Sequence, residues 1–187
     1  MLLEGRAVPA ARYIAPYVQT PPDVVERMLE LAAIRPGNVL HGLGGGDGRV
    51  VLAASTTYGI RAVGYEIDPD LVVDARDAIA RAGVGHLAEI RAHDVLAADL
   101  SGATVFTLYH TPGANVRLRP RILAHAPRGA RVVSHEFGMG CGGRARVERM
   151  CDAHGLAHTL CLWQLRAARS RPSVVNRQDA RANSPSN

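Results

Sequence analysis

Apolar and polar positions along the chain form a regular series of short apolar runs and longer amphipathic segments. Each short apolar run predicts a buried strand, and each segment with apolar residues three or four positions apart predicts a helix. The predicted strands are 39–43, 62–66, 86–92, 104–109 and 130–135, and the predicted helices are 48–58, 69–82 and 113–126. Pro120 lies inside the last helix and is expected to interrupt or kink it. Such alternation is typical of an α/β fold, in which a parallel sheet has helices on both faces.

The pattern is different on either side of this series. Before it, Thr20-Pro21-Pro22-Asp23 predicts the start of a helix with Thr20 as its N-cap, and the helix is expected to end at 35–37. After it, residues 144–150 and 158–165 alternate in polarity, which predicts two strands of an antiparallel hairpin.

The sequence predicts one folded domain over residues 1–166, with residues 1–20 as a segment that lies over its surface. Residues 167–187 are rich in Arg, Ser, Asn and Pro and lack apolar periodicity, so they are predicted to be a disordered tail.

A glycine-rich turn follows the first predicted strand. Gly44, Gly46 and Gly48 form a G-x-G-x-G pattern, and the dinucleotide pattern G-x-G-x-x-G fits this stretch in no register. A strand, a glycine turn and a helix let the backbone approach an adenosine-bearing ligand closely. The turn therefore indicates such a ligand, without requiring a pyrophosphate.

Glu66 stands at the end of the next predicted strand. A carboxylate at this position can accept hydrogen bonds from both hydroxyls of a ribose. The alternative is an ordinary exposed acid at a strand end. Because Glu66 lies one helix beyond the glycine turn, ribose binding is the favoured interpretation.

Further segments accompany the turn and Glu66 in a fixed order, namely 15–22, 46–49, 64–69, 103–109, 117–120, 132–137 and 158–163. Together they resemble class I S-adenosylmethionine-dependent methyltransferases, and within these the small archaeal and mitochondrial protein-lysine methyltransferases, over roughly residues 12–166. The resemblance implies a Rossmann-like, doubly wound, mostly parallel seven-strand sheet with a C-terminal antiparallel hairpin. It also implies S-adenosyl-L-methionine as cofactor and a lysine side chain of a protein as methyl acceptor.

The resemblance also implies which residues bind the cofactor. Besides Glu66 for the ribose, these are Tyr17, Thr20, Gly44, Gly46 and Asp47 near the methionine portion and Asp94 at the adenine. Each side chain has a structural alternative: Tyr17 can merely pack, Thr20 can cap a helix, Asp47 can brace the loop, and Asp94 can hold a turn.

On the acceptor side, the resemblance points to the end of the strand 104–109. Tyr109 is the candidate for contact with the methyl acceptor, with His110 at the rim. His135 and Glu136 are candidate proton acceptors, or structural residues. An Asn/Asp-Pro-Pro-Tyr motif is absent here, which argues against methylation of DNA adenine or of glutamine.

Gly42 departs from the family pattern, because relatives usually carry an acid at the head of the glycine loop. The absence of this acid is expected to weaken cofactor binding. An alternative interpretation is therefore a weakly active or non-catalytic module that binds an adenosine ligand. A small-molecule methyltransferase is a further alternative.

Charge and cysteine content limit the partners. Residues 1–165 hold 17 arginines against 16 acidic residues, so the net charge of +5 belongs mainly to the end of the chain. No nucleic-acid partner is therefore predicted.

The three cysteines, Cys141, Cys151 and Cys161, lack the spacing of a zinc site, so no metal is predicted. Their sparse, odd number favours a reducing, cytoplasmic location. No apolar run reaches the roughly 20 residues of a membrane span, so no stable membrane anchor is expected. The oligomeric state is left undefined.

Overall fold

The computed structural model describes residues 15–140 and 145–165 of the 187-residue chain. The predictions for residues 1–14, for Cys141 and for the tail at 167–187 lie outside the described residues.

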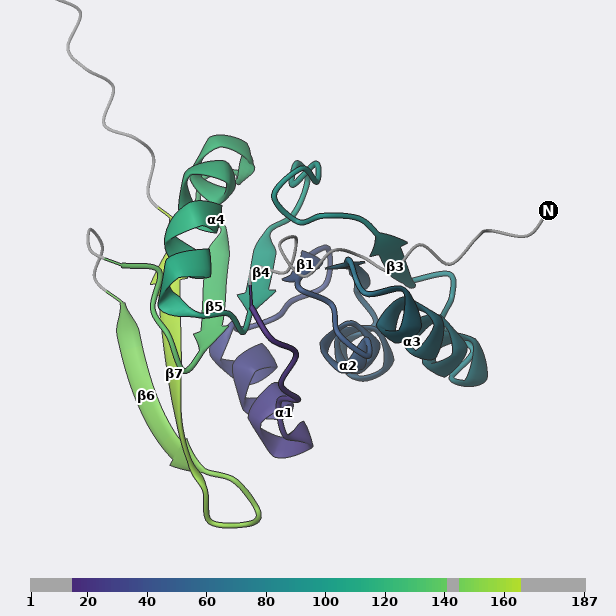
Figure 1. Ribbon diagram of the computed structural model, residues 1–187, viewed down its shortest axis with the longest axis horizontal. Coiled ribbons are helices and arrows are strands. Elements are labelled where there is room, and N and C mark those ends of the chain that lie inside the picture. The colour runs from purple at the N-terminus through teal and green to yellow at the C-terminus, as the bar shows by residue number, and fades with distance from the viewer. Residues whose placement is uncertain (1–14, 141–144, 166–187) are drawn as a thin grey trace, which may run out of the picture.

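Helices and strands alternate through the described chain as far as the fifth strand, and two further strands follow (Figure 1). The helices are α1 (Pro22–Leu31), α2 (Arg49–Tyr58), α3 (Pro69–Arg81) and α4 (Pro112–His125). The strands are β1 (Val39–Leu43), β2 (Arg61–Glu66), β3 (Ala88–Ala92), β4 (Val105–Leu108), β5 (Arg131–His135), β6 (Arg146–Cys151) and β7 (Ala157–Gln164).

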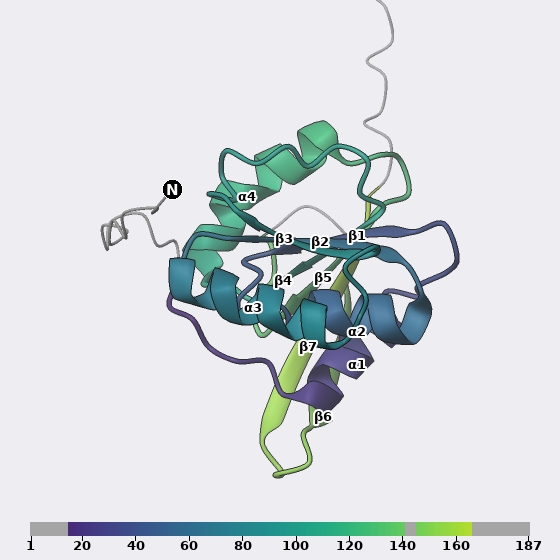
Figure 2. The same ribbon diagram turned by 90° about the vertical axis from the view of Figure 1, so that its right-hand side faces the viewer.

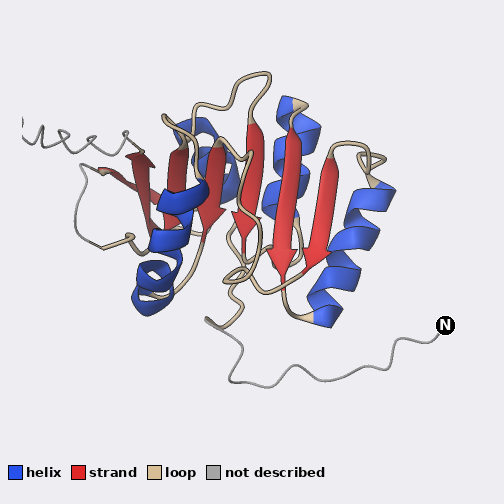
Figure 3. Cartoon of the chain, turned by 90° about the horizontal axis from the view of Figure 1, so that it is seen from above, coloured by secondary structure: helices blue, strands red, loops and turns tan. Residues whose placement is uncertain are grey.

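The seven strands form a single sheet in the order β3-β2-β1-β4-β5-β7-β6 (Figure 3). The first five strands are parallel, and β7 runs antiparallel to both β5 and β6. The predicted doubly wound sheet with a C-terminal antiparallel hairpin is therefore confirmed. The chain order reverses between β1 and β4, and in such sheets ligands bind at this point, beyond the carboxyl ends of the strands.

Helices cover both faces of the sheet, with α1, α2 and α3 on one face and α4 on the other (Figure 2). Successive residues of a strand point to opposite faces, so each strand contributes to two cores. Leu40 packs in the core beneath α1, α2 and α3, while Leu43 packs in the core shared with α4. Apolar runs such as Val39–Leu43 are continuous because both faces of the strand are buried.

The start of α1 differs from its prediction. The helix begins at Pro22, and its N-cap residue is Pro21, which makes no side-chain capping bond. Thr20 is not the cap, because its hydroxyl lies 3.2 Å from Nδ1 of His135 on β5. The backbone N–H of Val24, which a cap would serve, donates instead to Asp23 Oδ1 at 3.0 Å. The helix also ends earlier than predicted, at Leu31.

Pro120 does not interrupt α4, which runs from Pro112 to His125 with this proline inside it. A proline within a helix has no N–H to donate to the carbonyl four residues earlier. Pro120 and Val116 are both exposed, so water can satisfy the carbonyl of Val116.

The β6–β7 hairpin lies against α1 (Figure 1). Arg27 on α1 forms an ion pair with Glu148 on β6, and the N–H of Ala153 in the hairpin turn donates to Asp23 Oδ2 at 2.7 Å. These contacts hold α1 against the hairpin. Within the described ranges, no helix has the length and apolar character needed to cross a membrane.

Candidate functional site

A cavity lies at the carboxyl ends of the parallel strands, where the order of the sheet reverses. Its lining includes every residue predicted to bind the cofactor, together with the predicted acceptor-side tyrosine: Tyr17, Thr20, Gly44, Gly46, Asp47, Glu66, Asp94 and Tyr109. Glu136 does not line it. The fold thus brings together residues from the segment before α1 and from the ends of β1, β2, β3 and β4.

The glycine loop after β1 forms the floor of the cavity. The N–H groups of Gly44 and Gly45 donate to the carbonyl of Tyr65 on β2, at 3.1 and 2.7 Å. Gly44 and Gly46 have φ values of +82° and +54°, a region that favours glycine. A Cβ on Gly44 would lie 2.5 Å from His110 Cε1, and one on Gly46 would lie 2.6 Å from Tyr17 Cε2. Any side chain at either position would therefore displace an aromatic neighbour.

Glu66 joins the end of β2 to this loop. Its Oε2 accepts a hydrogen bond from the N–H of Gly46 at 2.7 Å. Its Oε1 accepts from the N–H groups of Ile67 and Asp68, at 2.8 and 2.9 Å. The side chain is largely buried, so the alternative of an ordinary exposed acid does not describe it. A carboxylate has about four lone-pair sites, and three backbone donors leave about one for a further partner.

Asp47 braces the loop through Arg49. Its Oδ1 accepts from Arg49 Nε at 2.9 Å, and its Oδ2 also contacts the guanidinium. Burial opposes ionisation of Asp47, but the hydrogen bonds from Arg49 outweigh burial and hold the pKa of Asp47 below its usual range. Arg49 also donates from Nη1 to the carbonyl of Thr20 at 2.6 Å. The pair therefore links the glycine loop to the segment before α1, a role of Arg49 that the sequence pattern did not reveal.

Asp94 lies just after β3, where it holds a turn. Its Oδ1 accepts from the N–H of Leu96 at 2.8 Å. Among the described residues no group hydrogen-bonds to its Oδ2, so one carboxylate oxygen is left for a ligand in the cavity. The structural and the ligand-binding interpretations of Asp94 are thus compatible.

His110 is buried beneath the glycine loop, and its predicted place at the rim is wrong. The side chain is only slightly exposed because the ring packs directly under Gly44. Burial lowers the pKa of His110 to about 4, so the imidazole is neutral at physiological pH. Its Nε2 is buried without a hydrogen-bond partner among the described residues, although it belongs to a residue that lines the cavity. Such an orphaned nitrogen at a cavity wall is a candidate contact for a bound ligand.

Tyr109 follows β4 and forms part of the cavity wall. Its ring packs against the imidazole of His135, with centroids 4.0 Å apart. Burial raises the pKa of Tyr109, and the negative charge of Glu136 adds to this effect. The phenol therefore stays protonated at neutral pH and can donate a hydrogen bond into the cavity.

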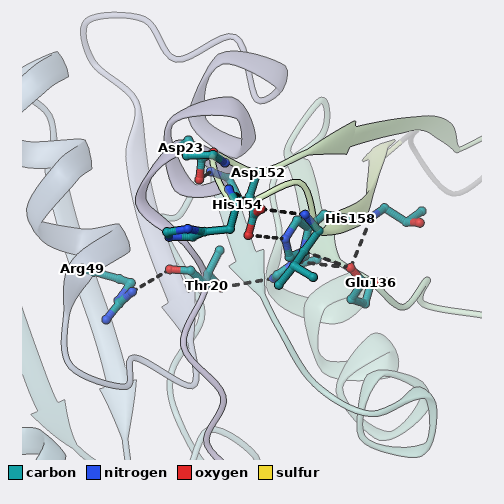
Figure 4. Close-up of polar contacts among 12 residues, drawn as sticks. Thr20, Asp23, Arg49, Glu136, Asp152, His154 and His158 are labelled. Carbon is teal, nitrogen blue, oxygen red and sulfur yellow. Dashed lines mark hydrogen bonds and ion pairs between the residues drawn. The ribbon is translucent and has the colours of Figure 1, made fainter.

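Glu136, the second predicted catalytic residue, lies behind this wall. Its Oε1 is 3.4 Å from His135 Nε2 and 3.3 Å from His158 Nδ1 (Figure 4). Its position does not support direct contact with a methyl acceptor. Sequence reasoning assigned no role to His158 or to Asp152, which contacts it, because the hairpin brings them to β5 across a long sequence separation.

Comparisons with known proteins agree with this architecture. The family profile of the ANTKMT methyltransferase domain matches residues 42–142. A protein-lysine N-methyltransferase of Saccharolobus islandicus is 35% identical over 149 residues, which cover 79% of this chain and 92% of the relative. The adenine nucleotide translocase lysine N-methyltransferase of Mus musculus is 38% identical over 133 residues, or 71% of this chain and 57% of the mouse protein.

A solved structure is also similar to the chain. It is described as an RNA methyltransferase from Salinibacter ruber in complex with S-adenosyl-L-homocysteine. Its sequence is 46% identical, the match covers 81% of this chain and 95% of that chain, and the TM-score is 0.75.

Proposed function

Because the chain belongs to the ANTKMT methyltransferase family, whose members use S-adenosylmethionine, we propose that it methylates the side-chain amine of lysine residues in a protein. The observation that carries this proposal is the match to the archaeal protein-lysine N-methyltransferase over 92% of that relative's length. The mouse relative is also described as a lysine N-methyltransferase, and the chain spans 57% of its length.

The residues of the cavity fit S-adenosylmethionine. Glu66 has acceptor capacity for a ribose hydroxyl, and Asp94 Oδ2 for the adenine amino group. The buried Nε2 of His110 has no hydrogen-bond partner within residues 15–140 and 145–165, as expected if a ligand supplies one. Backbone N–H groups at the start of α2 favour an anionic ligand group such as a carboxylate.

When bound, S-adenosylmethionine supplies an electrophilic methyl carbon on a sulfonium. The protein must then align the acceptor with this carbon and exclude water. Tyr109 and the buried Thr107, at the end of β4, both line the cavity, and we assign them to the acceptor side. A lysine amine that enters between such walls loses solvation, which lowers its pKa and favours the neutral, nucleophilic form.

A second candidate function is methylation of RNA. It is favoured by the 46% identity to the Salinibacter ruber protein, which is described as an RNA methyltransferase. The charge of residues 1–165 argues against it, because this part of the chain carries 17 arginines and 16 acids. RNA-binding surfaces are usually strongly basic or carry aromatic residues on which bases stack.

The experiment that separates the two uses S-adenosylmethionine with an isotopically labelled methyl group. The purified chain is incubated with a protein extract of its host, with the same extract after chemical acetylation of lysines, and with total RNA. The chain itself contains no lysine, so a lysine-free tag ensures that all methyl-lysine comes from the acceptor.

We expect label in the untreated protein fraction, loss of that label after acetylation, and methyl-lysine in acid hydrolysates. Label that survives protease and disappears with ribonuclease would replace the proposal with RNA methylation. Label in dialysable compounds alone would indicate a small-molecule methyltransferase. Binding of S-adenosylmethionine without label in any fraction would favour the non-catalytic module.

A further inference from the structure

Three side chains behind Tyr109 bring their ligand atoms together outside the cavity. His135 and Glu136 stand at the end of β5, and His158 lies on β7, the strand that pairs with β5. His135 Nε2 lies 2.9 Å from His158 Nδ1. Glu136 Oε1 lies 3.4 Å from the first of these nitrogens and 3.3 Å from the second. Two imidazole nitrogens and one carboxylate oxygen thus form a compact triangle.

The dimensions of this triangle fit a single metal ion. Zn–N and Zn–O bonds of about 2.0–2.1 Å place neighbouring ligand atoms about 3.3–3.4 Å apart on a tetrahedral ion. Bonds of the same length place two ligand atoms about 2.9 Å apart when the angle between the bonds is a right angle, as on an octahedral ion. All three observed separations fall within these limits. Imidazole and carboxylate together suit divalent first-row transition metals.

The second nitrogen of each imidazole also has an oxygen partner. His158 Nε2 lies 3.2 Å from Asp152 Oδ2, and His135 Nδ1 lies 3.2 Å from Thr20 Oγ1 (Figure 4). Histidine ligands of metals almost always engage the other ring nitrogen in this way, which fixes the tautomer and the ring orientation. Asp152 is itself held by the N–H groups of His154 and Leu156, at 2.9 and 2.8 Å.

The backbone at Glu136 is unusual. Its φ of +63° lies in the left-handed region, which a residue with a side chain rarely adopts. Its N–H donates to the carbonyl of Thr159 at 2.7 Å, so pairing with β7 continues through this residue. Residues held in such conformations cluster at functional sites. The residue with this conformation, Glu136, is the one whose carboxylate contacts both histidines.

We propose that His135, Glu136 and His158 bind a divalent transition-metal ion such as Zn²⁺. The ion takes the place of the hydrogen bond between the two histidines, and no proton is lost. The proton on His135 Nε2 moves to Nδ1, where Thr20 Oγ1 accepts it, while His158 keeps its proton on Nε2 toward Asp152. The remaining coordination positions are left for water.

Such an ion connects three parts of the chain. It joins β5 to β7 directly, and through Thr20 it holds the segment before α1, which also contacts Arg49 of the glycine loop region. The site therefore has a structural role beside the cavity. It differs in location and ligand chemistry from the groups that fit S-adenosylmethionine.

The test is calorimetric titration of the full chain with Zn²⁺ after treatment with a chelator and a reductant, followed by Co²⁺ titration with visible spectroscopy. We expect one ion per chain with micromolar or tighter affinity, and Co²⁺ bands of a low-symmetry nitrogen and oxygen site. Glu136→Gln and His158→Ala should each weaken Zn²⁺ binding by at least 10-fold. Asp152→Asn should weaken it by roughly 10–100-fold, since it alters the partner of a ligand.

The matched control is His86→Ala, which removes an exposed histidine from the turn before β3 and should leave Zn²⁺ affinity unchanged. Melting temperatures without metal show whether each variant folds, and Glu136→Gln preserves the shape of the side chain. The proposal is overturned if the wild type shows no saturable binding, or if folded Glu136→Gln and His158→Ala bind as tightly as His86→Ala.

Discussion

The carboxylate of Glu66 accepts a hydrogen bond from the backbone N–H of Gly46 at 2.7 Å, although the two residues are 20 positions apart. The bond ties the end of β2 to the middle of the glycine loop. The residue predicted to bind the ribose therefore also fixes the loop that is predicted to bind the methionine portion. Cofactor affinity and loop order are expected to depend on the same side chain.

Replacing Glu66 by alanine should affect both properties. Loss of the hydrogen bond between a ribose hydroxyl and the remaining acceptor site of this carboxylate is expected to cost about 1.5–3 kcal/mol of cofactor binding, which weakens affinity about 10- to 100-fold. The variant also leaves the N–H of Gly46 without its acceptor, which should destabilise the fold by about 1–3 kcal/mol. Calorimetric titration with S-adenosylmethionine and urea denaturation measure the two effects.

Glu89→Ala is the matched control, because Glu89 is an exposed strand acid on β3 whose partner is Arg91. It should change neither affinity nor stability appreciably. If Glu66→Ala folds and binds S-adenosylmethionine as tightly as Glu89→Ala, Glu66 is not the ribose ligand.

Gly42 stands at the head of the glycine loop, where related sites usually carry an acid. A Cβ at this position would lie 3.5 Å from Val51 Cγ2 and 3.8 Å from Thr107 Oγ1, which is ordinary contact. We therefore expect Gly42→Asp to fold. If the acid supports a hydrogen bond worth about 1–3 kcal/mol, the variant should bind S-adenosylmethionine several-fold to about 100-fold more tightly.

Gly85→Asp is its control, since a Cβ there meets nothing within 4 Å and the residue lies outside the cavity. Affinity should be unchanged in this variant. Tight binding by the wild type, with no gain from Gly42→Asp, would show that the acid is unnecessary in this chain.

Tyr109 is expected to act on the acceptor and not on the cofactor. Tyr109→Ala removes the wall that packs on His135, so the acceptor amine should be less well aligned with the methyl group. Misalignment of this kind can lower kcat/KM about 10–100-fold. Affinity for S-adenosylmethionine should stay nearly constant.

Steady-state kinetics with the protein acceptor and separate cofactor titration distinguish these effects. Tyr58→Phe, at the end of α2 and outside the cavity, is the control. A loss of cofactor affinity equal to the loss of kcat/KM would place Tyr109 on the cofactor side instead.

His41 should make stability depend on pH. It is buried on β1 between the rings of Tyr65 and Phe106, and burial lowers its pKa from about 6.5 to about 4. The unfolded chain therefore binds a proton at a higher pH than the folded chain. The contribution of neutral His41 to the free energy of unfolding is complete above the unfolded pKa. It decreases as the pH falls from about 6.5 to 4 and is constant below 4. The contribution of His41 is roughly 3 kcal/mol at most.

His41→Phe retains an aromatic ring but cannot titrate. Its free energy of unfolding, measured by urea denaturation between pH 4 and 7, should fall less steeply than that of the wild type. His86→Ala, which removes an exposed histidine, should leave the slope unchanged. Equal slopes for His41→Phe and the wild type would show that His41 is not held neutral by the fold.

Most of the fold follows from local pattern. Apolar runs of strand length alternate with amphipathic segments, and only a parallel sheet with helices on both faces buries them all. The errors occur where a tertiary contact competes with a local preference. Thr20 has the side chain of a helix cap, but its hydroxyl pairs with His135 on a distant strand. Pro120 favours a break, but the buried Leu118 and Ile122 on either side keep α4 on the sheet.

The sequence by itself determined that the glycine loop, Glu66 and Tyr109 lie at one edge of the sheet, because the chain order of an α/β fold places the carboxyl ends of its parallel strands there. Only the tertiary structure decided the partners of these groups. His110 is buried because its ring packs against the glycine loop, and Glu66 accepts a hydrogen bond from the N–H of Gly46. His135 and His158 are 23 positions apart, and no spacing rule relates them. Antiparallel pairing of β5 with β7 brings their nitrogens to 2.9 Å, and a slip of one residue in this register would turn one of the two side chains to the other face of the sheet.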